Sequence, residues 1–69
     1  MEFREQLMEL RKQRGWSQEQ LGAKIGVTRQ TVSKWETGDT TPELAKLIEL
    51  SSLFEISVDR LIGIEERKD

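Results

Sequence analysis

The chain has 69 residues, no cysteine, no histidine, one proline and a formal net charge of −2. At this length we expect one domain with a small core. The absence of Cys and His excludes a disulfide framework and the commonest metal ligands, and it removes the usual near-neutral acid or base of catalysis. No apolar run approaches the roughly 18 residues of a membrane span, and the N-terminus lacks the apolar stretch of a signal peptide. The composition therefore predicts a small cytoplasmic domain that is not an enzyme and holds no cofactor or metal.

Charge is unevenly distributed along the chain. Between Arg11 and Lys34 there are six basic residues and one acid, whereas between Thr37 and Asp69 there are four basic residues and eight acids. The net charge alone would argue against a binder of nucleic acid, but the first of these segments carries the excess of Lys and Arg that contact with phosphates needs. The alternative is that two solvated faces merely differ in sign.

Apolar residues recur at helical spacing in three stretches of the first forty residues. The first stretch is 2–13, the second covers about two turns after Ser17, and the third runs from about 28 to 36. Ser17 and Thr28 are suitable N-caps for the second and third stretches, and a glycine follows each of the three. The pattern predicts three short helices.

Two more helices are predicted in the second half of the chain. Residues 40–42 (Thr-Thr-Pro) form the next start signal, with Thr40 and Glu43 as a possible capping box, although either threonine could be the cap. The helix that follows carries apolar residues around much of its circumference, which is typical of the central element of a small bundle. These residues are Leu44, Leu47, Ile48, Leu50, Leu53 and Phe54.

A short fifth helix starts after Ser57 and closes at Gly63. Residues 64–69 form a charged tail that we expect to be frayed. The sequence thus predicts a single all-α domain of five helices over residues 1–63.

The second and third predicted helices, joined by a tight turn, form a helix-turn-helix pattern. Packing their apolar residues together leaves an outward set that is rich in hydrogen-bond donors and contains no acid. The outward set consists of Thr28, Arg29, Gln30, Ser33 and Lys34.

Several short motifs follow one another in a fixed order between Phe3 and Gly63. They are Leu7-x-x-Leu10-Arg11, Trp16-Ser17-Gln18-x-x-Leu21, Gly26-Val27-Thr28, Val32-Ser33-Lys34-Trp35-Glu36-x-Gly38, Pro42 and Ser57-Val58-Asp59-x-Leu61. In this order they resemble the Xre-type, or lambda-repressor-like (Cro/C1-type), helix-turn-helix regulators of bacteria and phages. The resemblance implies a compact five-helix DNA-binding domain whose third helix enters the major groove. It also implies a sequence-specific transcriptional regulator, and we expect a repressor that binds a two-fold operator as a homodimer.

Four residues of the predicted third helix are candidates for base contacts. The guanidinium of Arg29 can donate two bonds to guanine, and the amide of Gln30 can bond bidentately to adenine. Both lie in the first turn, which reaches the base edges in this docking geometry. Thr28 could contact a base, a thymine methyl or a phosphate while it caps the helix, and Lys34 could reach a base or a phosphate. The alternative for each is an ordinary solvated side chain.

Other residues are candidates for contacts with the DNA backbone. Gln18 lies at the start of the second helix, where free N–H groups can receive a phosphate, and the resemblance implies that its side chain contacts the backbone too. Ser33, Arg14 and Thr37 could add further phosphate contacts.

The resemblance assigns two charged residues to structure instead of DNA contact. It implies a partly buried ion pair between Arg11 and Glu36 that fixes the recognition helix. Trp16 and Trp35 are likewise expected in the core, because both occupy apolar-periodic positions.

Three positions depart from the pattern of the family. Gly22 stands where alanine is usual, which close helix packing would explain. Ser51 also replaces alanine, so a buried hydroxyl would have to bond back to the chain. Glu55 stands where glycine often ends the fourth helix, which would place a non-glycine residue at positive φ.

A dimer needs an apolar surface, and three isoleucines are the candidates: Ile56, Ile62 and Ile64. They could equally be core residues or isolated exposed side chains. The acidic second half leaves another function open, that of a protein-interaction module such as a DNA-binding antitoxin or an adaptor. An enzyme is the least favoured alternative, because no base stands at a recognisable spacing beside a nucleophile.

Overall fold

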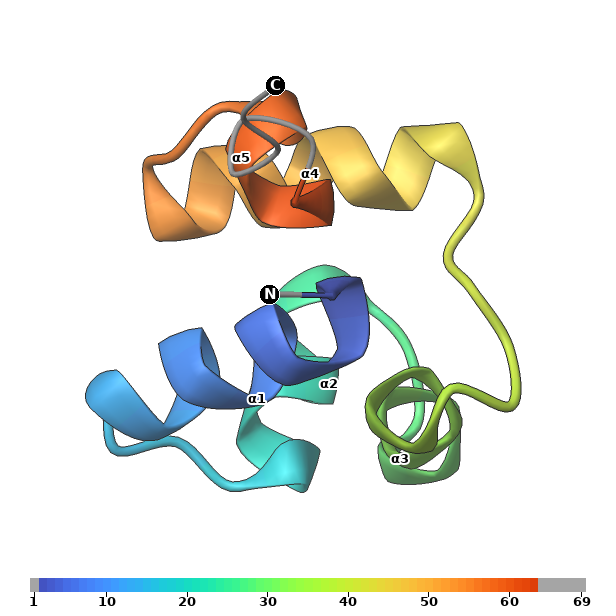
Figure 1. Ribbon diagram of the computed structural model, residues 1–69. Helices are drawn as coiled ribbons and strands as arrows, with labels where there is room; N and C mark the ends of the chain where they lie inside the picture. Colours follow the sequence, from blue (N-terminus) through green and yellow to red (C-terminus); the bar gives the residue numbers. More distant parts are fainter. Residues whose placement is uncertain (1, 64–69) are drawn as a thin grey trace.

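Residues 2–63 are the part of the chain that the computed structural model describes. They contain five helices and no strand: α1 (Phe3–Gln13), α2 (Gln18–Ile25), α3 (Arg29–Thr37), α4 (Leu44–Phe54) and α5 (Val58–Ile62). In Figure 1, α4 and α5 lie above α1, α2 and α3, and the loop that follows α3 runs up one side of the molecule to reach α4. The expected all-α fold with five helices is confirmed. The predicted charged tail, 64–69, lies outside the described residues.

Every helix contributes one fully buried aliphatic side chain to a common core. These side chains are Leu7, Leu21, Val32, Leu50 and Leu61. Ile25, Trp35 and Phe54 complete the buried cluster, and Trp16 packs against it from the side. Both tryptophans therefore pack as expected, although Trp16 is only half-buried. Since the core draws on all five helices, no helix can shift without disturbing the position of α3.

The contact between α2 and the turn before α3 passes over Gly22. A Cβ at this position would lie 2.5 Å from the carbonyl oxygen of Val27. The amide of Val27 in turn donates to the carbonyl oxygen of Gly22 at 2.9 Å. The close packing expected at this glycine is therefore confirmed.

Gly22→Ala is expected to lower the free energy of unfolding by about 1 to 2 kcal/mol. The strain of a Cβ against a backbone oxygen outweighs the roughly 1 kcal/mol that alanine gains in helix propensity. Urea denaturation followed by circular dichroism measures the change. Ala23→Gly, at the exposed neighbouring position, is the control for propensity alone, and a Gly22→Ala variant more stable than the parent would contradict the steric argument.

The start of α4 differs from the prediction. Its N-cap is Glu43, whose side chain makes no capping hydrogen bond. Thr40 and Thr41 are exposed in the preceding loop, so the predicted threonine cap and capping box are wrong. The physical reason is the burial of Pro42, because the helix begins two residues after this proline and leaves both threonines too far back to reach its first-turn N–H groups.

The outer face of α4 also differs from the prediction. Leu44 and Ile48 were expected among the core residues, but they are 66% and 52% exposed. The rest of the molecule covers α4 on one side only, the side that carries the buried Leu50 and Phe54. These two exposed residues lie one turn apart on the helix surface.

Two expected features of α4 are confirmed. Glu55 ends the helix in the left-handed region, with φ of 59°. The hydroxyl of Ser51 donates to the carbonyl oxygen of Ile48 at 2.9 Å. A contact that was not expected joins α4 to α2, since the ammonium of Lys46 donates to the carbonyl oxygen of Ile25 at 2.9 Å.

Candidate nucleic-acid interface

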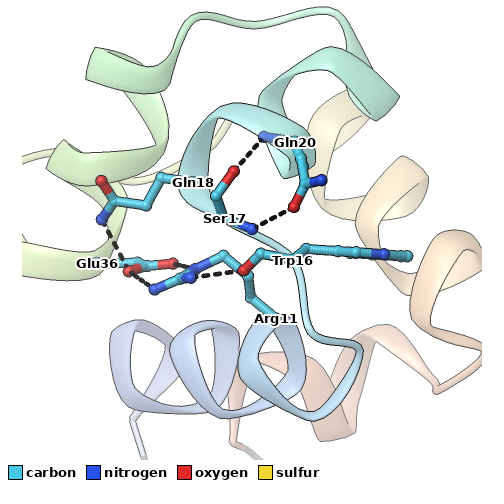
Figure 2. A network of polar contacts seen from close by, with 6 residues as sticks. All are labelled: Arg11, Trp16, Ser17, Gln18, Gln20 and Glu36. Atoms are coloured by element: carbon cyan, nitrogen blue, oxygen red, sulfur yellow. Dashed lines mark hydrogen bonds and ion pairs between the residues drawn. The ribbon is translucent and has the colours of Figure 1, made fainter.

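Side-chain caps fix the ends of the two helices that form the helix-turn-helix. The hydroxyl of Ser17 accepts from the amide of Gln20 at 3.0 Å, and the side chain of Gln20 accepts from the amide of Ser17 at 2.7 Å (Figure 2). Thr28 caps α3 by accepting from the amide of Thr31 at 3.1 Å. Gly26 ends α2 in the left-handed region, with φ of 76°. All three features were expected from the sequence, and together they set the angle at which α3 leaves the turn.

The two faces of α3 differ in what they contact. Val32, Trp35 and Glu36 are buried on the inner face. The opposite face is formed by polar side chains that are exposed, except for Ser33, which is half-buried. This outward face consists of Thr28, Arg29, Gln30, Ser33, Lys34 and Thr37.

The donors of this outward face are largely unpaired. Within residues 2–63, the side chains of Arg29, Gln30, Ser33 and Lys34 make no hydrogen bond or ion pair. The face contains no acid, because the one carboxylate of α3, that of Glu36, is buried. An exposed helix surface of unpaired donors matches the acceptors on base edges and phosphates.

The two threonines at the ends of this face also have local partners. The hydroxyl of Thr28 shares a 3.0 Å contact with that of Thr31, besides capping the helix. The hydroxyl of Thr37 donates to the carbonyl oxygen of Lys34 at 3.2 Å. Both side chains remain exposed, so a role on DNA and a role in the helix are compatible.

A buried polar network connects α1, α2 and α3 (Figure 2). The carboxylate of Glu36 accepts from Nε of Arg11 at 2.7 Å and from Nη2 at 3.1 Å. The third nitrogen of this guanidinium, Nη1, donates to the carbonyl oxygen of Trp16 at 2.8 Å. The side chains of Arg11 and Glu36 are only 12% and 2% exposed. The structure thus shows the ion pair that the resemblance implied.

Gln18 is the third member of this network. Its side-chain nitrogen donates to Oε1 of Glu36 at 3.0 Å, a contact that no local sequence pattern announces because the two residues are 18 positions apart. Gln18 stays half-buried at the first position of α2. Its amide is therefore held in one orientation beside the outward face of α3.

Arg14 has a structural partner that was not expected. Its Nη2 donates to the carbonyl oxygen of Phe54 at 3.2 Å, and its guanidinium carbon lies 5.6 Å from the ring centroids of both Trp16 and Phe54. The C-terminal end of α1, which Arg14 follows, lies across the molecule from α3 in Figure 1. The structure therefore does not bring Arg14 to the outward face of α3.

The candidate dimer residues are only partly accessible. Ile56 and Ile62 are half-buried, with Ile56 packed against the core, and Ile64 lies outside the described residues. The exposed large apolar residues of the described chain are Leu44 and Ile48. The sequence pattern missed them because it does not show which side of α4 is covered.

Two capped helices at a tight turn, the second with an unpaired donor face, have the architecture of a helix-turn-helix DNA-binding domain of the lambda-repressor type. The comparisons with known proteins agree with this class. A helix-turn-helix family model matches residues 7–61. The chain belongs to this helix-turn-helix family of DNA-binding transcriptional regulators, whose members do not act as enzymes.

Three relatives illustrate the family. The HTH-type transcriptional regulator YgzD of Bacillus subtilis is 38% identical over 93% of this chain and 97% of its own. The HTH-type transcriptional activator BcrR of Enterococcus faecalis is 39% identical over 96% of this chain, which spans only 32% of that protein. The P22 c2 repressor, crystallised with a synthetic operator, superposes with a TM-score of 0.85 at 30% identity, over 91% of this chain and 96% of its own.

No helix within residues 2–63 combines the length and the apolar character that crossing a membrane would require.

Proposed function

We propose that this protein recognises a specific sequence of double-stranded DNA by placing α3 in the major groove. The observation that carries the proposal is the outward face of α3, where exposed donors lack partners and the nearby acid is turned into the core. Arg29 and Gln30, in the first turn of α3, read base edges. Thr28 and Lys34 add base contacts on either side of them.

Phosphate contacts on this side of the molecule come from Gln18, Ser33 and Thr37. Gln18 is the best placed of the three, because its amide is oriented by Glu36 and its backbone N–H belongs to the free first turn of α2. Arg14 was a fourth candidate, but its bond to Phe54 favours a structural role.

We infer that the regulator is a repressor that acts in the cytoplasm. Occupying an operator is sufficient to block a promoter, and the relative crystallised with its operator is named a repressor. BcrR, which is named an activator, is matched over only about a third of its length.

Binding as a homodimer follows from the size of the interface. A single module of this size buries about 600 to 1,000 Å² on DNA, which is too little for tight specific binding. Two copies on half-sites about 34 Å apart double this area. Ile56, Ile62 and Ile64 remain the proposed dimer surface, and Leu44 with Ile48 adds an exposed apolar pair on α4.

Selection of binding sites from random duplexes, followed by titration of the best site at several salt concentrations, tests the proposal. We expect an enriched two-fold sequence, two chains per duplex, and a linear fall of log affinity with log salt concentration. Failure to enrich any sequence over random DNA, together with affinity that does not depend on salt, would show that the proposed function is wrong.

A further inference from the structure

The C-terminal end of α3 is covered by a side chain from α1. A Cβ built on Gly38, the residue that ends α3, would lie 3.2 Å from Nη1 and 3.3 Å from Cδ of Arg4. Gly38 thus leaves the space through which the guanidinium of Arg4 reaches the end of the recognition helix. No sequence pattern pointed to Arg4 as a candidate contact.

Arg4 lines an open hollow of about 320 Å³ with two threonines of the loop after α3. Thr40 and Thr41 are exposed, and within the described residues their hydroxyls have no hydrogen-bond partner. The buried ring of Trp35 forms part of the wall. A guanidinium beside two unpaired hydroxyls is a set of donors suited to a phosphate group.

The acids near this hollow do not close it. Nε of Arg4 lies 3.3 Å from a carboxylate oxygen of Glu2, and the two side chains are 48% and 72% exposed. Asp39, next to Gly38, is exposed as well. An ion pair between exposed groups is weak, and this one engages Nε, so the terminal nitrogens of Arg4 stay free for a stronger bidentate partner.

The hollow lies on the side of α3 away from Gln18. Successive residues of an α-helix are about 100° apart around the axis, so outward-facing Thr37 lies between Glu36 on one side and Gly38 on the other. Glu36 contacts Gln18, and Gly38 contacts Arg4. The outward face of α3 is therefore bordered by Gln18 on one flank and by Arg4 on the other.

This spacing fits the groove into which α3 is proposed to bind. An α-helix with its side chains is about 10–12 Å across, and the major groove is about 12 Å wide between its two phosphate backbones. We propose that Arg4, with Thr40 and Thr41, binds a phosphate of the DNA strand opposite the one that Gln18 contacts. The inference rests on the proposed function and gives α3 a phosphate contact on each border of the groove.

The test compares Arg4→Ala with Arg60→Ala on the selected duplex and on random duplex. Arg60 is an exposed arginine of α5, in the layer above α3 in Figure 1, so its replacement makes the same change in net charge far from the proposed contact. Arg4→Ala is expected to reduce the slope of log affinity against log salt by about 0.9, the value for one phosphate contact, and to weaken both duplexes by the same factor. Arg60→Ala should leave the slope unchanged.

A scan with single neutral methylphosphonates along each strand locates the contact. In the parent protein, affinity should fall at phosphates on both borders of the groove. Arg4→Ala should abolish the sensitivity at one phosphate, and Gln18→Ala should abolish it at a phosphate of the other strand. Glu2→Gln should strengthen binding, and only when Arg4 is present.

Arg4 is exposed, so we expect its variants to melt at the parent temperature, and Arg4→Lys should keep most of the salt slope. If the parent protein binds a specific duplex but Arg4→Ala changes neither the slope nor the methylphosphonate pattern, the inference is wrong while the proposed function stands. If the parent protein binds no DNA, the proposed function itself fails.

Discussion

Glu36→Ala is expected to lower the free energy of unfolding by about 3 to 5 kcal/mol. The substitution leaves the guanidinium of Arg11, only 12% exposed, without its carboxylate partner, and removing one member of a buried pair has a cost of this size. The side-chain amide of Gln18 loses its acceptor as well. Because a domain of 69 residues has only a few kcal/mol of stability in total, we expect the variant to be largely unfolded at room temperature, which urea denaturation of parent and variant measures.

Two further variants separate the charge of Glu36 from its shape. Glu36→Gln keeps an oxygen that can accept from Gln18 but removes the charge, so its loss of stability should be intermediate. The double variant Arg11→Met with Glu36→Leu removes both charges, and replacing a whole buried ion pair by apolar residues is often neutral. We expect the double variant to be more stable than Glu36→Ala alone. A Glu36→Ala variant within about 1 kcal/mol of the parent would contradict the argument, because the pair would then contribute no more than an exposed one.

This network also links stability to the interface. Glu36 lies on the inner face of α3, yet its carboxylate holds both Arg11 of α1 and Gln18 of α2. The same contacts that anchor α3 in the core orient the side chain proposed to bind phosphate. A loss of DNA affinity in a Glu36 variant must therefore be compared with its folded fraction before it is assigned to the interface.

The helix boundaries could be predicted well because their signals are local. Ser17 with Gln20, Thr28 and Ser57 each cap a helix through atoms within three residues of the cap. Gly26 and Gly63 end helices at positive φ, which glycine adopts without strain. Where the local signal was ambiguous, at the threonines before α4, burial of a neighbouring proline decided the outcome.

Contacts between distant segments could not be predicted in this way. The bonds from Lys46 to Ile25 and from Arg14 to Phe54 join helices whose relative positions depend on the whole core. The exposure of Leu44 has the same origin, because the sequence of α4 is apolar on several sides and only packing selects the buried one. Arg4 was missed since its importance depends on the space above Gly38, which lies 34 positions further along the chain.

The arrangement of the layers explains why the net charge was misleading. Most of the acids after Thr37 belong to α4, α5 and their flanking segments, in the layer above the helix-turn-helix, while the basic segment from Arg11 to Lys34 runs through the lower layer (Figure 1). Opposite charges on opposite sides give the molecule a preferred orientation in the field of DNA. Because the acids reduce the overall attraction to phosphate, specific binding depends on base contacts.

Arg29→Ala is expected to relax the preference at one base pair of the operator, at a cost of about 1 to 3 kcal/mol, or roughly 5- to 150-fold in affinity for the preferred sequence. The guanidinium of Arg29 is exposed and unpaired in the first turn of α3, so no structural contact is lost with it. Random duplex should be weakened far less, because a base contact contributes little to non-specific binding. Repeating the site selection with the variant shows which position has lost its preference.

Arg29→Lys distinguishes a base contact from a phosphate contact at this position. Lysine keeps the positive charge but lacks the planar fork that donates two parallel bonds to guanine. If Arg29 reads a base, the lysine variant should keep the salt dependence of the parent and still lose much of the preference, whereas Gln30→Ala should change a different position of the site. If Arg29→Ala instead weakens selected and random duplexes equally and leaves the enriched sequence unchanged, Arg29 contacts phosphate, and the base reading must come from Gln30 and Lys34.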